Sequence, residues 1–119
     1  MTSSVSWVFE VAVKAGEADN LKKLIAEMAE RAEANEPDTL SFQWSISADG
    51  ATAQVHERYA HSQAALTHLE SFNQNYADRL MALVEPQRMT VYGNPDEALR
   101  ETLAGADPVF MESAGGFTR

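Results

Sequence analysis

Residues 39–59 constrain the fold more than any other stretch, because they read as two strands joined by a tight turn. From Thr39 to Ala48 apolar and polar side chains alternate, which is typical of a half-buried strand. Asp49-Gly50 favours a hairpin turn, since glycine readily adopts the positive φ that such turns need. The sequence therefore predicts that Ala51–Tyr59 pairs antiparallel with the preceding strand.

The flanking segments add helices and strands to this hairpin. Val5–Lys14 alternates like a strand, and Glu17–Asn35 carries apolar residues at helical spacing. Pro37 ends that helix by disfavouring helical geometry at the residue before it. A second helix is expected from Ser62, whose hydroxyl can accept a hydrogen bond from the first turn.

The last part of the pattern is a helical segment up to Pro86 and a strand over Arg88–Gly93. The resulting order β-α-β-β-α-β predicts an α+β fold of the ferredoxin-like, split-βαβ type with an antiparallel sheet. We expect residues 1–93 to form this domain.

The character of the sequence changes after Gly93. Asn94 is a helix cap with Pro95 at the first helical position, and the short helix ends near Gly105. A brief strand is expected at Val109–Glu112. We interpret residues 94–119 as a helix and arm that pack on the same domain or on a partner subunit.

The two faces of the predicted sheet differ in polarity. One face is apolar enough to receive both helices and contains Trp7, Phe9, Phe42, Trp44 and Val55. The other face is small and semi-polar and contains Val8, Ala12, Ser41, Gln43, Ser45, His56 and Thr90. A sheet face in contact with water normally carries more charge. We therefore expect this face to meet the sheet of a second copy, which predicts a homodimer.

Composition excludes several classes of function. The formal net charge of −9 disfavours nucleic-acid binding, which needs a basic surface. The absence of cysteine excludes disulfides, thiol catalysis and thiolate metal sites. No apolar run approaches the roughly 20 residues that span a bilayer, and no signal peptide is apparent. The expectation is a cytoplasmic protein without a membrane partner.

Chemically versatile side chains gather around the strand and helix between residues 51 and 76. Glu57 and Tyr59 share one face of the strand, and His68 lies on the apolar stripe of the helix. We therefore predict that His68 meets Glu57 and Tyr59 between helix and sheet. An inward carboxylate also needs partners, because burying an unpaired charge is costly.

The patterns of other site classes are missing. His61 and His68 are two helical turns apart, too far to share one metal ion, and His56 lies on the opposite strand face from Glu57. No serine-nucleophile elbow and no phosphate-binding loop is present. We therefore expect no bound metal, and no local motif supports flavin or nicotinamide binding.

The pattern E-x-Y-x-x-x-x-A-x-x-x-H, formed by Glu57, Tyr59, Ala64 and His68, follows an E-P-D-T-L turn at Glu36–Leu40. With these motifs the chain resembles the antibiotic biosynthesis monooxygenase family over about residues 5–93. The resemblance implies a dimeric α+β barrel, and some members of the family oxygenate quinols or anthrones without a cofactor.

This resemblance, together with the residues, predicts a cofactor-independent monooxygenase acting on a small quinol-like or anthrone-like aromatic. In it His68 is the base or hydrogen-bond acceptor, Glu57 orients it, and Tyr59 bonds a substrate oxygen. The aromatic substrate contacts are Trp44, Phe42, Phe72 and Tyr76. Two alternatives remain: a non-catalytic dimer that binds a small ligand or is associated with stress, and an isomerase or lyase that needs no oxygen.

Overall fold

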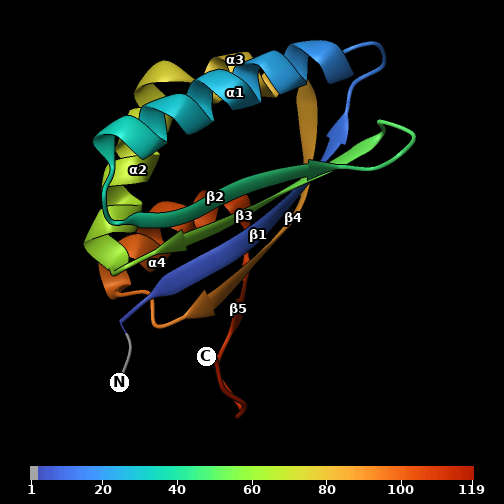
Figure 1. Cartoon of the computed structure of the whole chain (residues 1–119). Coiled ribbons are helices and arrows are strands. Elements are labelled where there is room, and N and C mark those ends of the chain that lie inside the picture. The colour runs from blue at the N-terminus through green and yellow to red at the C-terminus, as the bar shows by residue number, and fades with distance from the viewer. Residues whose placement is uncertain (1–2) are drawn as a thin grey trace.

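A computed structural model describes residues 3–119 as one five-stranded sheet with helices packed on one of its faces (Figure 1). None of the described helices is both long and apolar enough to cross a membrane. In chain order the elements are β1 (Val5–Val13), α1 (Ala18–Asn35), β2 (Thr39–Ile46), β3 (Thr52–Tyr59), α2 (Ser62–Asn75), α3 (Ala77–Met81), β4 (Val84–Gly93), α4 (Glu97–Leu103), a 3-10 turn (Ala104–Ala106) and β5 (Val109–Met111).

The strand order in the sheet is β2-β3-β1-β4-β5. The first four strands pair antiparallel, which confirms the predicted ferredoxin-like arrangement. β5 adds a parallel pairing to β4, so the complete sheet is mixed. The sheet of a single chain is open and does not close into a barrel. The dimeric barrel and the homodimer remain predictions.

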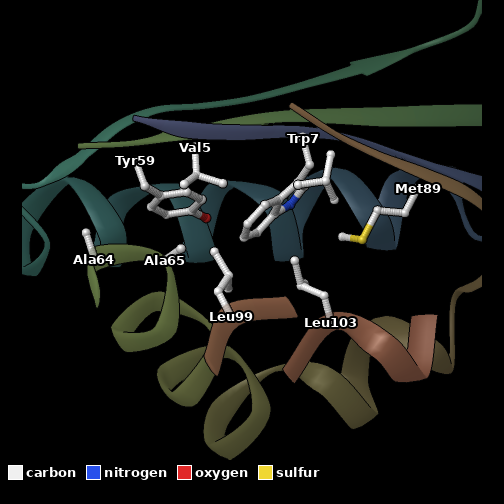
Figure 2. Close-up of a cluster of buried hydrophobic side chains, with 9 residues drawn as sticks. Val5, Trp7, Tyr59, Ala64, Ala65, Met89, Leu99 and Leu103 are labelled. Atoms are coloured by element: carbon white, nitrogen blue, oxygen red, sulfur yellow. The ribbon is translucent and has the colours of Figure 1, made fainter. Parts of the chain in front are cut away.

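The core lies between the sheet and the helices, in two clusters. The first joins the sheet to α2 and α4, and Figure 2 shows Trp7 and Met89 of the sheet pointing toward Leu99 and Leu103 of α4. The second joins the sheet to α1 and α3 and contains Val11, Leu21, Leu24, Met28, Ala53, Tyr76, Leu80 and Val84. The C-terminal helix therefore packs on the body of the domain through Leu99 and Leu103.

Two strand predictions need correction. The register of β2 against β3 shifts between Thr39 and Ser41, and Leu40 is 55% exposed instead of joining the apolar face. The residues expected to remain helical up to Pro86 instead begin β4 at Val84. Proline is tolerated there because β5 pairs only with residues 90–92, so β4 has no second neighbour at Pro86.

The predicted helix caps also differ from those observed. His61, not Ser62, caps α2, because its Nδ1 accepts a hydrogen bond from the amide of Ala64 at 3.1 Å. Asp96, not Asn94, caps α4. The Ser62 hydroxyl instead accepts from the backbone amide of Asp96 at 2.9 Å, which joins the starts of α2 and α4. Ser62 thus helps to hold the C-terminal helix against the domain.

Gly93 ends β4 close against the backbone at the start of β1. Its φ is 92°, and an added Cβ would lie 2.4 Å from the carbonyl oxygen of Ser4. We expect Gly93→Ala to lower the free energy of unfolding by about 2–3 kcal/mol, because it combines backbone strain with a clash. Gly105→Ala is the control, since its Cβ meets nothing within 4 Å. Urea denaturation of both variants measures the difference, and equal stabilities would contradict the prediction.

Candidate active site

Three acidic or basic side chains from different elements meet at one end of the helix–sheet interface. Nδ1 of His68, on α2, lies 2.7 Å from Oε1 of Glu36, in the connection between α1 and β2. Nε2 of the same ring lies 3.3 Å from Oε1 of Glu57, on β3. The imidazole is therefore held between two carboxylates, and only 9% of its side-chain surface is exposed.

Glu57 is fixed by two further donors from the sheet. Nε1 of Trp7 donates to Oε2 of Glu57 at 2.7 Å, and the hydroxyl of Tyr59 donates to Oε1. Trp7 is opposite Glu57 in the pairing of β1 with β3, and Tyr59 follows it by two residues on the same face. These charge-assisted hydrogen bonds compensate the burial of the carboxylate.

The two carboxylates change the protonation of His68. Burial alone lowers the pKa of this imidazole, but the hydrogen bonds and negative charges of Glu57 and Glu36 outweigh it, so that the net pKa lies above the ordinary value of 6.5. Burial, reinforced by the charge of Glu57, raises the pKa of the Tyr59 phenol well above 10. Tyr59 consequently remains a protonated donor at neutral pH.

An apolar cavity of about 200 Å³ adjoins this network. Glu57 and His68 form part of its wall, and most of the remaining wall is aromatic or aliphatic. Helix α4 and the turn after it close one side through Thr102, Leu103 and Ala106. A cavity of this size and composition suits a small, largely apolar ligand with one or two polar groups.

The structure gathers five of the seven predicted site residues around the cavity: His68, Glu57, Trp44, Phe42 and Phe72. Tyr59 is fully buried behind Glu57 and does not line the cavity. Its hydroxyl donates to Glu57, so in this structure the phenol holds the carboxylate and does not face the cavity. Tyr76 packs in the second core cluster and lines only a smaller hollow beside Phe72.

Sequence reasoning missed several contributors. Glu36 belongs to the E-P-D-T-L turn, but no periodicity indicates that this turn folds back onto His68. Trp7 was assigned to the core, although its indole also holds Glu57. The polar side chains of Asn73 and Thr102 line the cavity as well. The E-P-D-T-L motif that contains Glu36 was the one sequence feature that could have pointed to these missed residues.

The other two histidines lie outside this site. His56 is exposed on the opposite face of β3, and Nε2 of His61 lies 3.6 Å from Oδ2 of Asp38 near the surface. Within residues 3–119, no group of three or more histidine, aspartate or glutamate side chains is arranged to hold a metal ion.

Solved structures share this fold, although no protein-family model and no curated protein matches the sequence. MupZ from Pseudomonas fluorescens superposes with a TM-score of 0.87 at 23% identity, over 99% of this chain and 96% of that one. A provisionally named antibiotic biosynthesis monooxygenase from Nitrosomonas europaea gives 0.69 at 21% identity, over 79% and 92% of the two chains. SnoaB, a cofactor-independent oxygenase from Streptomyces nogalater, gives 0.65 at 16% identity, over 80% and 96%.

At these identities the likeness is one of fold. The chain has the fold of the antibiotic biosynthesis monooxygenases, as its motifs predicted. The match to MupZ extends over the C-terminal helix and arm, since it covers almost the entire chain, whereas the other two cover about four-fifths.

The raised pKa of His68 makes stability depend on pH. The folded protein binds a proton that the unfolded chain releases near pH 6.5, so the stabilisation is complete below that pH and is lost as the pH rises through the higher folded pKa. We expect the free energy of unfolding to fall above about pH 6.5. Urea denaturation between pH 6 and 9 measures this fall. In His68→Gln the curve should be flatter, and the same slope in both proteins would contradict the assignment.

Proposed function

We propose that the protein is a monooxygenase that oxygenates a small hydroxyaromatic compound, such as a quinol or an anthrone, without a metal or flavin cofactor. The observation that carries the proposal is the imidazole of His68, held between Glu36 and Glu57 at the wall of an aromatic-lined cavity. The fold shared with SnoaB, a cofactor-independent oxygenase, supports it.

The first step is removal of a proton from the bound substrate. The aromatic ring lies against Trp44, Phe42 and Phe72, with its acidic hydroxyl or C–H group toward Glu57 and His68. In its neutral form His68 keeps a proton on Nδ1 for Glu36, because that contact is the shorter one. Nε2 then accepts the substrate proton, and Glu57 stabilises the resulting imidazolium.

The second step uses electrons of the substrate anion. The anion reduces dioxygen and forms a carbon–oxygen bond, and the resulting peroxide anion takes back the proton from Nε2 of His68. This gives a hydroperoxide at the reacting carbon and restores the neutral imidazole. Loss of water from an anthrone hydroperoxide leaves a carbonyl group. One oxygen atom remains in the product and the other leaves as water with the two hydrogens of the original CH2 group. No external reductant is needed, and the apolar wall excludes water from the anion.

The remaining polar residues position this pair. Trp7 and Tyr59 fix the carboxylate of Glu57, and Glu36 fixes the ring of His68. Because the base is the neutral imidazole and its pKa is raised, oxygen uptake should increase with pH above about 6.5, over the range in which stability falls. Opposite pH trends of activity and stability are expected when the same imidazole is both the catalytic base and, when protonated, a stabilising charge.

An oxygen electrode tests the proposal directly. The wild-type protein is given a panel of hydroquinones, naphthoquinols and anthrones, and uptake is corrected for the spontaneous reaction. Enzyme-dependent uptake with at least one of these compounds is expected. A wild-type protein that is inert to the complete panel would contradict the proposal and leave a non-catalytic ligand-binding protein as the better description.

The acid–base network also favours a second candidate, an isomerase or lyase on a similar substrate. His68 between two carboxylates supplies proton transfer, and nothing in that arrangement requires oxygen. Conversion of a panel compound that proceeds equally fast under nitrogen would identify this class.

A further inference from the structure

A second hollow adjoins the cavity that contains the acid–base pair. It has a volume of about 450 Å³ and lies between β4 and the turn that follows α4. Four residues line both spaces: Phe9, Met81, Met89 and Ala106. The cavity and this second space, which we call the outer hollow, therefore share one wall.

The shared wall lies away from His68 and Glu57. Glu57 is opposite Trp7 in the pairing of β3 with β1, whereas Met89 is opposite Phe9 in the pairing of β4 with β1. Met89 is thus two strands and one inward-facing row from Glu57, a separation of roughly 12 Å, since strands lie about 4.8 Å apart and each residue adds about 3.4 Å. A ligand that reaches from the acid–base pair to the shared wall spans the length of the cavity.

The helix side of the shared wall is small and flexible. Phe9 and Met89 form the sheet side, and Met89 is buried. On the helix side, Met81 at the end of α3 is 37% exposed, and Ala106 is exposed in the turn after α4. Alanine carries only a methyl group, and the unbranched side chain of methionine adapts to its surroundings. A ligand can therefore displace this side of the wall at little cost.

The opposite end of the cavity has no comparable space next to it. The hollow behind His68, which Glu36 and Phe72 also line, has a volume of about 10 Å³. A space of that size holds at most about one water molecule. Of the two neighbouring hollows, only the outer one can receive part of a ligand.

We infer that the cavity and the outer hollow form one binding groove, joined between Met81 and Ala106, and that the substrate is a hydroxyaromatic with an extended apolar substituent. The substituent lies opposite the reacting group and passes through the joint, as in a quinol with a long alkyl or alkoxy chain. This inference rests on the proposed function, because it places the acidic group at Glu57 and His68. The apolar residues of the outer hollow that would contact the substituent are Phe9, Pro86, Met89 and Val109.

Two stable quinol ethers test this groove by calorimetry without turnover. 4-Methoxyphenol fits within the cavity, and 4-hexyloxyphenol carries five more CH2 groups on the same ring. Each CH2 group that leaves water completely should tighten binding about fourfold. Because the outer hollow is partly open, we expect the wild type to bind the hexyl ether about 10-fold or more tightly than the methyl ether.

A bulky side chain at the joint should abolish this preference. In Ala106→Trp the indole fills the space between the two parts of the groove, so the ratio of the two affinities should fall close to one. Met81→Trp narrows the joint from the other side and should lower the ratio in the same way. Ala104→Trp is the matched control, because Ala104 is exposed in the same turn and lines neither space. Its ratio should equal that of the wild type.

The outcomes separate this inference from the proposed function. Equal wild-type affinities for the two ethers, no binding of either, or a ratio that survives both Ala106→Trp and Met81→Trp would overturn the continuous groove. The same fall of the ratio in Ala104→Trp would do so too. If the ratio behaves as expected while no hydroxyaromatic drives oxygen uptake, the groove stands and the oxygenase assignment fails. Uptake with quinols that lack a long substituent, together with a wild-type ratio near one, overturns the groove and leaves the oxygenase intact.

Discussion

Replacement of His68 by alanine is expected to lower enzyme-dependent oxygen uptake by about 10²-fold or more, the usual scale for loss of a general base. The ring lies within ion-pair distance of both Glu36 and Glu57, so alanine removes the proton acceptor and leaves two carboxylates facing a gap. Uptake at saturating substrate, measured above pH 7, gives the relevant rate.

His61→Ala is the matched control for this variant. His61 precedes the same helix, but it caps the first turn and does not line the cavity beside His68. We expect it to lose about 1 kcal/mol of stability through the cap and to retain its oxygen uptake. Equal loss of activity in both histidine variants would mean that the effect of His68→Ala is structural.

Replacement of Glu57 by leucine should have the largest effect on stability, because it leaves two buried donors, the indole of Trp7 and the hydroxyl of Tyr59, without an acceptor. It also removes the carboxylate that lies 3.3 Å from Nε2 of His68. Removing one partner of a buried charged network typically costs about 3–5 kcal/mol. Urea denaturation measures the loss, and Glu57→Gln should recover part of it because an amide oxygen still accepts.

Glu10 provides the comparison for Glu57. It lies on the neighbouring strand β1 and is also hydrogen-bonded, but its partners are Gln54 at 2.8 Å and the exposed Arg88 at 3.4 Å. Glu10→Leu should therefore cost less than about 1 kcal/mol, as is usual for an ion pair with a solvent-exposed partner. Similar losses for the two leucine variants would contradict the importance of the buried network.

Much of the fold is readable from the sequence, because its signals are local. The alternation of β2, the Asp49-Gly50 turn and the apolar stripe of α1 each determine one element and its buried face. The same periodicities bring His68 of α2 over Glu57 of β3, since each residue faces the interface between helix and sheet. This part of the site therefore follows from the alternation along β3, the helical spacing along α2 and the short connection between them.

The remainder of the site depends on long-range contacts that the spacing of apolar residues in the sequence does not predict. Glu36 reaches His68 from a connection 32 residues earlier in the chain. Leu103 closes the cavity from a helix whose placement depends on the hydrogen bond between Ser62 and Asp96. Strand alternation shows which face of β3 Tyr59 is on, and this led to the prediction that it bonds the substrate. Alternation does not show that the side chain lies behind Glu57. Faces can be predicted from sequence, whereas depth and long-range pairing require the fold.

If the cavity beside His68 brings dioxygen to a bound hydroxyaromatic, an oxygen atom of the gas should appear in the product. The most direct measurement is to supply anthrone under ¹⁸O-labelled dioxygen and to weigh the product by mass spectrometry, with His68→Ala and protein-free samples as references. We expect a quinone that carries one labelled oxygen atom and forms much faster with the wild type than with either reference. A product without label, or equal rates in all three samples, would contradict it.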